Sequence, residues 1–169
     1  MSNKFILLII LLITPVLIYG YIFNQGKGEN TAASTDLIPT ANLPDSFTYL
    51  GSHETPVNIG GSSINATEGV YRNNGNDLYI NVIENNNPQA LLAQYKEQIQ
   101  NEFKSKYNPF TPISLNGHDA TQITYFDIVK GQQKPDYTVV WTTGKAMISV
   151  ASPTADLQIV ITLAKATGL

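Results

Sequence analysis

Two histidines, each followed by an acidic residue, are the side chains in this sequence best suited to chemistry. His53 precedes Glu54, and His118 precedes Asp119 directly after an Asn-Gly pair. A zinc site needs three or four converging ligands, and acid–base catalysis needs groups within hydrogen-bond reach of one another. The two pairs lie far apart in the chain, so only the fold could bring them together. The same residue types are also common at turns and strand ends, where polar side chains bond the local backbone.

No other stretch carries a catalytic pattern. The chain lacks a Gly-x-Ser-x-Gly elbow, and Gly60-Gly61-Ser62-Ser63 lacks the Gly-Lys-Ser/Thr ending of a phosphate-binding loop, so we expect it to be a flexible loop. There is no cysteine, which excludes disulfides, thiolate metal sites and a catalytic thiol. Nothing selects a glycosidase-type pair from the acidic residues of the domain: Glu54, Glu68, Glu84, Asp127 and Asp136. We therefore predict no catalytic residue, metal or cofactor.

The composition argues against a nucleic-acid partner. The 169 residues carry a formal charge of −3, and only 14% of them are charged. Lysines and arginines are scattered, whereas nucleic-acid binders gather them in a patch. The polar residues are mainly Asn, Thr, Gln and Tyr, and such an uncharged polar surface suits an extracellular protein.

Residues 1–23 are predicted to be a transmembrane anchor or signal segment. Residues 5–23 carry no charge and would span about 28 Å as a helix, close to the thickness of a bilayer core. Lys4 precedes the run, which places its start on the inner side by the positive-inside rule. Ile18-Tyr19-Gly20 is a poor cleavage site, so we favour an uncleaved anchor. The alternative is a cleaved signal peptide and a secreted domain; in both cases the rest of the chain is extracytoplasmic.

Residues 24–43 have the composition of a flexible linker, and residues 44–169 are predicted to form one extracytoplasmic domain. Within the domain, Asn65-Ala66-Thr67 is a sequon that makes Asn65 a candidate glycosylation site.

Three turn signals predict antiparallel hairpins. Asn74-Gly75 and Asn116-Gly117 are typical of type I′ turns, which need positive φ at both central residues. Thr143-Gly144 is predicted as a third two-residue loop. The pairs expected across that loop are Trp141 with Ala146, Val139 with Ile148, and Tyr137 with Val150. Their side chains share one face, and Val140, Met147, Thr138 and Ser149 share the other.

Two helices are predicted between and after the hairpins. The first is capped by Asn87, has Pro88 at its first position and is closed by Lys104 and Lys106. The second is expected to open at Ser152-Pro153 and to run to the C-terminal Gly168. The predicted fold class is α+β: an antiparallel sheet built of hairpins with two helices packed on it.

Aromatic and apolar residues of the third hairpin are the candidates for a ligand or partner surface. Tyr137 and Trp141 are expected mainly in the core, with a pocket between sheet and helix as the functional alternative. Val140 and Met147 lie on the second face, which would be a partner surface if no helix covered it.

The C-terminal half resembles a group of small envelope domains, the DUF4367 and PsbP/Mog1-like domains. The resemblance rests on Asn116-Gly117-His118, the strand with central Trp141, the Gly144 turn, the strand around Met147 and the closing helix. It implies a sandwich of sheet and helices with a binding, assembly or sensing role, and it transfers no functional residue.

The sequence is thus interpreted as a non-catalytic, membrane-anchored, extracytoplasmic domain that binds an envelope protein or a small ligand, or acts in assembly. A hydrolase with a His/carboxylate site is one alternative. The other is a pilin-like structural protein, because a hydrophobic N-terminal helix bearing a β-rich head can polymerise.

Overall fold

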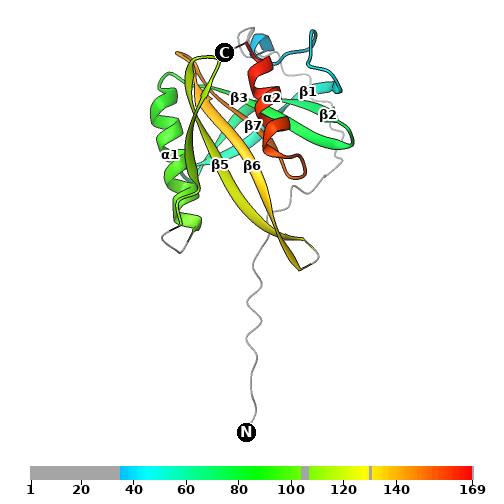
Figure 1. Ribbon diagram of the computed structural model, residues 1–169. Helices are drawn as coiled ribbons and strands as arrows, with labels where there is room; N and C mark the ends of the chain where they lie inside the picture. The colour runs from blue at the N-terminus through cyan, green and yellow to red at the C-terminus, as the bar shows by residue number, and fades with distance from the viewer. Residues whose placement is uncertain (1–34, 104–106, 130, 169) are drawn as a thin grey trace, which may run out of the picture. The chain divides into compact units, whose positions relative to one another are not determined.

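In the part of the chain that the structure describes, seven strands form one antiparallel sheet, and two α-helices pack on it. The structure is a computed structural model that describes residues 35–103, 107–129 and 131–168. The strands lie in the order β1-β2-β3-β7-β6-β5-β4 (Figure 1), which confirms the predicted α+β class. After a 3-10 turn at Thr35–Leu37, the elements are β1 (Phe47–Ile59), β2 (Ser62–Asn73), β3 (Asn76–Glu84), α1 (Pro88–Glu102), β4 (Phe110–Leu115), β5 (His118–Val129), β6 (Gln132–Thr142), β7 (Ala146–Ser152) and α2 (Leu157–Ala166).

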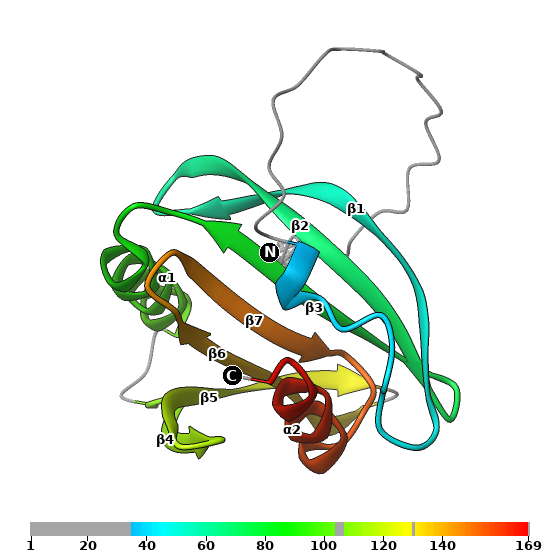
Figure 2. The same ribbon diagram turned by 90° about the horizontal axis from the view of Figure 1, so that it is seen from above.

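Each face of the sheet carries its own core. On β6, Val139 and Trp141 belong to the core that includes Val160 and Leu163 of α2. Val140 lies between them in sequence and belongs to the other core, with residues of α1. Because successive side chains of a strand point to opposite faces, the two helices lie on opposite sides of the sheet (Figure 2).

Both predicted Asn-Gly turns are confirmed. Asn74 and Gly75 have φ values of 48° and 86°, and Asn116 and Gly117 have 47° and 87°, as a type I′ turn requires. The prediction of a flexible loop at residues 60–63 is wrong. Gly60 and Gly61 have φ values of 59° and 80° and join β1 directly to β2, so this stretch is a third tight hairpin turn.

The β6–β7 hairpin keeps the predicted faces but not the predicted register. Trp141 lies opposite Ile148 instead of Ala146, a shift of two residues. The cause is Thr143, which joins the ladder: its N–H donates to the carbonyl of Ala146 at 2.8 Å, and the loop becomes Gly144-Lys145. A two-residue shift preserves the face of every side chain, so the predicted separation of the two faces is confirmed.

The two helices differ in how well their starts could be predicted. Asn87 caps α1 as expected, its side chain accepting a hydrogen bond from the N–H of Ala90. Lys104 and Lys106 lie outside the described residues. The predicted start of α2 is wrong: Asp156 caps the helix and accepts from the N–H of Ile159. Ser152 is instead the buried last residue of β7, where its hydroxyl donates to the carbonyl of Asp77 at 2.7 Å.

The first part of the folded domain includes residues that composition assigned to the linker. Ile38 is 4% exposed and packs in the α2-side core. The hydroxyl of Tyr71 donates to the carbonyl of Pro39 at 3.0 Å, which fixes this segment against β2. The predicted anchor at residues 5–23 lies outside the described residues. Within the described ranges, no helix is both long enough and apolar enough to cross a membrane.

Candidate functional site

A cavity of about 870 Å³ opens at the end of the sheet where β3 leads to α1 and β6 turns into β7. We call it the turn cavity. Its volume lies within the range of about 300–1,000 Å³ that is usual for small-molecule sites. Its walls come from three separate parts of the chain: Leu37, Glu84, Asn85, Asn86, Thr143, Gly144, Lys145 and Ala146.

Backbone and side-chain hydrogen bonds hold the walls of the turn cavity together. The hydroxyl of Thr143 accepts from the N–H of Lys145 at 3.3 Å and from that of Ala146 at 3.0 Å. The N–H of Asn85 donates to the carbonyl of Lys145 at 2.9 Å, which joins the end of β3 to the turn. The side-chain oxygen of Asn85 accepts from the N–H of Asn87 at 2.7 Å and so shapes the loop into α1. The wall is therefore built before any ligand arrives.

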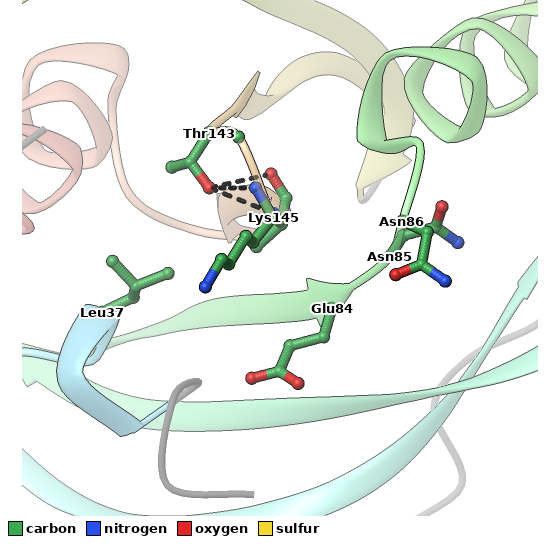
Figure 3. Close-up of a pocket in the computed structure, with 8 residues that line it drawn as sticks. Leu37, Glu84, Asn85, Asn86, Thr143 and Lys145 are labelled. Carbon is green, nitrogen blue, oxygen red and sulfur yellow. Dashed lines mark hydrogen bonds between the residues drawn. The ribbon is translucent and has the colours of Figure 1, made fainter.

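The turn cavity presents two opposite charges. Figure 3 shows the ammonium of Lys145 and the carboxylate of Glu84 reaching into the same space, with Leu37 beyond them. Within the described ranges, no ion pair joins these two side chains. Asn86 adds an amide, which can both donate and accept. The arrangement can therefore bind a polar ligand through charge and hydrogen bonds, with one apolar contact.

A second cavity of about 490 Å³ shares the Thr143-Gly144 wall with the turn cavity. Its other walls include the first turn of α1, where the amide of Gln89 donates to the hydroxyl of Thr142. His118 and Trp141 also line it. The indole N–H of Trp141 is buried and has no hydrogen-bond partner among the described residues. The two cavities lie side by side at this end of the sheet and share one wall.

The candidate partner surface on the third hairpin is mostly core. Trp141 is 1% exposed under α2, while Val140 and Met147, at 0% and 2%, are covered from the α1 side. Only Tyr137 is half-buried. Core packing, the expectation for Trp141, therefore holds, and Val140 and Met147 do not meet the condition of an uncovered face on which their partner surface depended.

The structure does not bring the two histidines together. His53 lies on the edge strand β1, and four strands separate it from His118 on β5. The acidic partner of His53 is Glu68, with 3.3 Å between Nε2 and Oε1, and not its neighbour Glu54. Glu54 instead accepts a hydrogen bond from the hydroxyl of Thr67 at 2.8 Å. In the part of the chain that the structure describes, no three His, Asp or Glu side chains are grouped to hold a metal ion.

Burial perturbs two of the candidate carboxylates. It raises the pKa of Glu68, although the charge of His53 and a hydrogen bond from Asn81 lower that pKa in part. Burial together with the charge of Asp127 raises the pKa of Asp136, and the two aspartates line a cavity of only about 150 Å³. Asn65, the candidate glycosylation site, is exposed on β2.

Sequence reasoning did not predict the lining of the turn cavity, apart from naming Glu84 among unselected acids. The local signal was the polar run Asn85-Asn86-Asn87 between a strand and a helix, since loops held by a rigid scaffold often carry binding groups. Lys145 carried no signal, because its position opposite Glu84 depends on the pairing of β3 with β7. No known protein family matches the chain, and neither the curated proteins nor the solved structures contain a match.

Proposed function

We propose that this protein is a non-catalytic binding domain, held at the outer face of a membrane by residues 5–23, and that its ligand occupies the turn cavity. The observation that carries the proposal is the convergence of Glu84 and Lys145 on one preformed cavity without pairing to each other. Opposite charges held apart by the backbone are complementary to a ligand that also carries both charges.

The ligand class that fits is a small zwitterion, such as a free amino acid or the end of a peptide. Its ammonium group would bind the carboxylate of Glu84, and its carboxylate would bind the ammonium of Lys145. The amide of Asn86 supplies a further donor and acceptor, and Leu37 offers contact to an apolar side chain. Charge-assisted hydrogen bonds are stronger than neutral ones, so this pair would dominate the selectivity.

The connection to the anchor supports a role close to the membrane. Leu37 belongs to the cavity wall, and residues 24–34 join it to the proposed anchor. Eleven residues extend over at most about 40 Å, so the cavity would stay within that reach of the bilayer. The resemblance to DUF4367 and PsbP/Mog1-like envelope domains remains part of this proposal and agrees with a binding role.

Calorimetric titration of the full chain tests the proposed function. We would titrate the protein in micelles of an uncharged polyoxyethylene detergent with the free amino acids and with a set of dipeptides. We expect at least one zwitterion to bind, and Lys145→Ala or Glu84→Ala to weaken it by about ten-fold or more, the scale of one lost charge-assisted hydrogen bond. The matched control is Lys134→Ala, which removes an exposed lysine of β6 outside the turn cavity.

Two results would contradict the proposal. One is the absence of saturable binding by any compound in the set. The other is binding that survives Glu84→Ala and Lys145→Ala unchanged, which would place the ligand elsewhere.

A further inference from the structure

The hairpin of β5 and β6 projects beyond the other strands of the sheet. β4 pairs with β5 only as far as Ile123, and β7 pairs with β6 only from Tyr137 onward. From there to the turn between them, β5 and β6 are paired with each other and, among the described residues, with no third strand. Figure 1 shows this end of the hairpin extending past the other strands. We call residues 124–128 and 132–136 the ribbon.

The two faces of the ribbon differ in polarity. Phe126 lies opposite Pro135, and Ile128 is on the same face two residues further along β5. Every ribbon residue on that face is uncharged, and we call it the apolar face. The other face carries Asp127 opposite Lys134. The ribbon therefore has the alternating pattern of a strand pair with one buried face.

The apolar face is nevertheless open to solvent. Ile128 is 80% exposed and Phe126 is 44% exposed, and among the described residues only Leu50 on β1 is another large apolar side chain of comparable exposure. The ring of Phe126 packs edge-on against the ring of Tyr107, with 5.9 Å between the ring centroids, which fixes its direction. Two neighbouring apolar side chains presented on a projecting hairpin indicate contact with a partner outside the domain.

The small extent of the apolar face favours a lipid bilayer over a protein as that partner. Phe126 and Ile128 together expose roughly 200 Å² of apolar side chain. A standard protein interface buries about 800 Å² on each partner, and a second copy of the chain would present only the same small face. A bilayer needs no matching surface, because apolar side chains enter between the head groups while Asp127 and Lys134 stay in water.

The chain itself brings the ribbon close to a bilayer. Residues 5–23 carry no charge and form the proposed anchor, so the inference rests on the membrane location in the proposed function. β6 spans 11 residues, about 35 Å, between the ribbon and the turn cavity. Residues 24–34 reach at most about 40 Å, so the ribbon can meet the bilayer that holds the anchor. Because the tether raises the local concentration of lipid, a contact through two side chains is sufficient.

We propose that the ribbon inserts Phe126 and Ile128 into the head-group region of the bilayer in which the chain is anchored. The contact gives the domain a second attachment to the membrane besides residues 5–23. The turn cavity lies at the other end of β6, so this attachment holds the cavity away from the bilayer and accessible from the aqueous side.

Quenching of a site-specific dye by lipids tests the proposal. The chain has no cysteine, so Gln133→Cys gives one labelling site, opposite Ile128 on the apolar face, and leaves both inserting side chains intact. The full chain, labelled with nitrobenzoxadiazole, is reconstituted into phosphatidylcholine vesicles that contain lipids spin-labelled near the head group. We expect the dye at position 133 to be quenched by these lipids and its emission to shift to the blue.

Substitutions of the inserting side chains should reverse the quenching. Ile128→Ser, added to the labelled chain, should lower the inserted fraction about ten-fold or more, the scale of removing one large apolar side chain from an apolar phase. Phe126→Ser should act in the same way, and melting temperatures establish that both variants are folded. The matched controls carry the dye at Lys134→Cys, on the charged face of the ribbon, and at Asn65→Cys, at an exposed position of β2. Neither control should be quenched beyond the level of a water-exposed dye.

Three results would overturn the proposal, and they are distinguishable. Quenching at position 133 that does not exceed the quenching at positions 134 and 65 means that the ribbon stays in water. A blue shift at position 133 without quenching by lipid means that a protein, such as a second copy, covers the apolar face. If the full chain does not float with the vesicles in a density gradient, the membrane location in the proposed function fails, and this inference fails with it.

Discussion

Substituting Gly69 by alanine tests whether residues 35–39 are part of the folded domain. A Cβ atom at Gly69 would lie 2.7 Å from Cγ2 of Ile38 and 3.2 Å from the ring of Tyr71. Both neighbours belong to the α2-side core, so neither can move freely. The backbone of Gly69 is not in the left-handed region, so alanine strains nothing but the packing.

The expected magnitude follows from two opposing effects. Overpacking a tight core costs about 1–3 kcal/mol. Replacing glycine by alanine within a strand returns about 0.5–1 kcal/mol. We therefore expect Gly69→Ala to lower the free energy of unfolding by about 1–2 kcal/mol. Ile38→Ala alone should cost about 2–5 kcal/mol, the usual loss for a buried isoleucine.

The double variant makes the prediction specific. With Ile38 shortened to alanine, a Cβ at position 69 no longer has its closest contact. The double variant should therefore lose less free energy of unfolding than the sum of the two single losses, by about 1 kcal/mol or more. Urea unfolding followed through the fluorescence of Trp141, the single tryptophan, measures all four states of the cycle. If Gly69→Ala were neutral or stabilising and Ile38→Ala cost almost nothing, residues 35–39 would not be packed on β2, and the wall that Leu37 gives to the turn cavity would be lost.

Three further predictions concern stability. Ser152→Ala should cost about 1–3 kcal/mol in urea unfolding, because it leaves the carbonyl of Asp77 and two backbone N–H groups without their partner. A loss below about 0.5 kcal/mol would contradict that network. Gly75→Ala should lower the free energy of unfolding by about 1 kcal/mol or more, since alanine disfavours a φ of +86°. Gly144→Ala should be neutral or slightly stabilising, because Gly144 has an ordinary φ and no atom near the position of a Cβ. Equal effects of the two substitutions would refute the turn assignment. Asp136→Asn should raise the melting temperature at pH 7, because a carboxyl whose pKa is raised in the folded state destabilises the fold when it is ionised. The gain should vanish towards pH 3, where the carboxyl of Asp136 is protonated in both the folded and the unfolded state. Asp119→Asn, at an exposed aspartate of β5, is its control, and a gain at Asp136 that persisted at pH 3 would refute the electrostatic cause.

Features set by a few neighbouring residues could be predicted from the sequence. The Asn-Gly turns need positive φ at two positions, and that need is read directly from the residue types. The cap at Asn87 and the proline after it likewise act within one helical turn. Successive side chains of β6 and β7 point to alternate faces with a period of two residues. The faces were therefore predicted correctly although the predicted register was wrong by two residues.

Features set by distant partners could not be predicted. Ser152-Pro153 has the residue types of a helix start, but the hydroxyl of Ser152 donates its hydrogen bond to the carbonyl of Asp77 on strand β3. Edge strand β1 was missed because Gly51 and Pro56 interrupt its pattern, and proline is tolerated there because an edge strand leaves some N–H groups unpaired.

The candidate sites depend on the sheet order in the same way. The turn cavity exists because β3 pairs with β7, which brings Glu84 opposite Ala146 and beside Lys145. The partnership of His53 with Glu68 arises from the β1–β2 register, while the adjacent Glu54 points to the other face. Neither arrangement has a signature in a short stretch of sequence.

The most direct test of the central claim is a map of where a bound zwitterion shifts the backbone resonances of the full chain. We would use the amino acid or dipeptide that binds most tightly in the calorimetric titration. The proposed function predicts saturable shifts at residues 84–86 and 143–146, all of which disappear in the Lys145→Ala variant. Shifts confined to other parts of the domain, or shifts at the turn cavity that persist without Lys145, would contradict it.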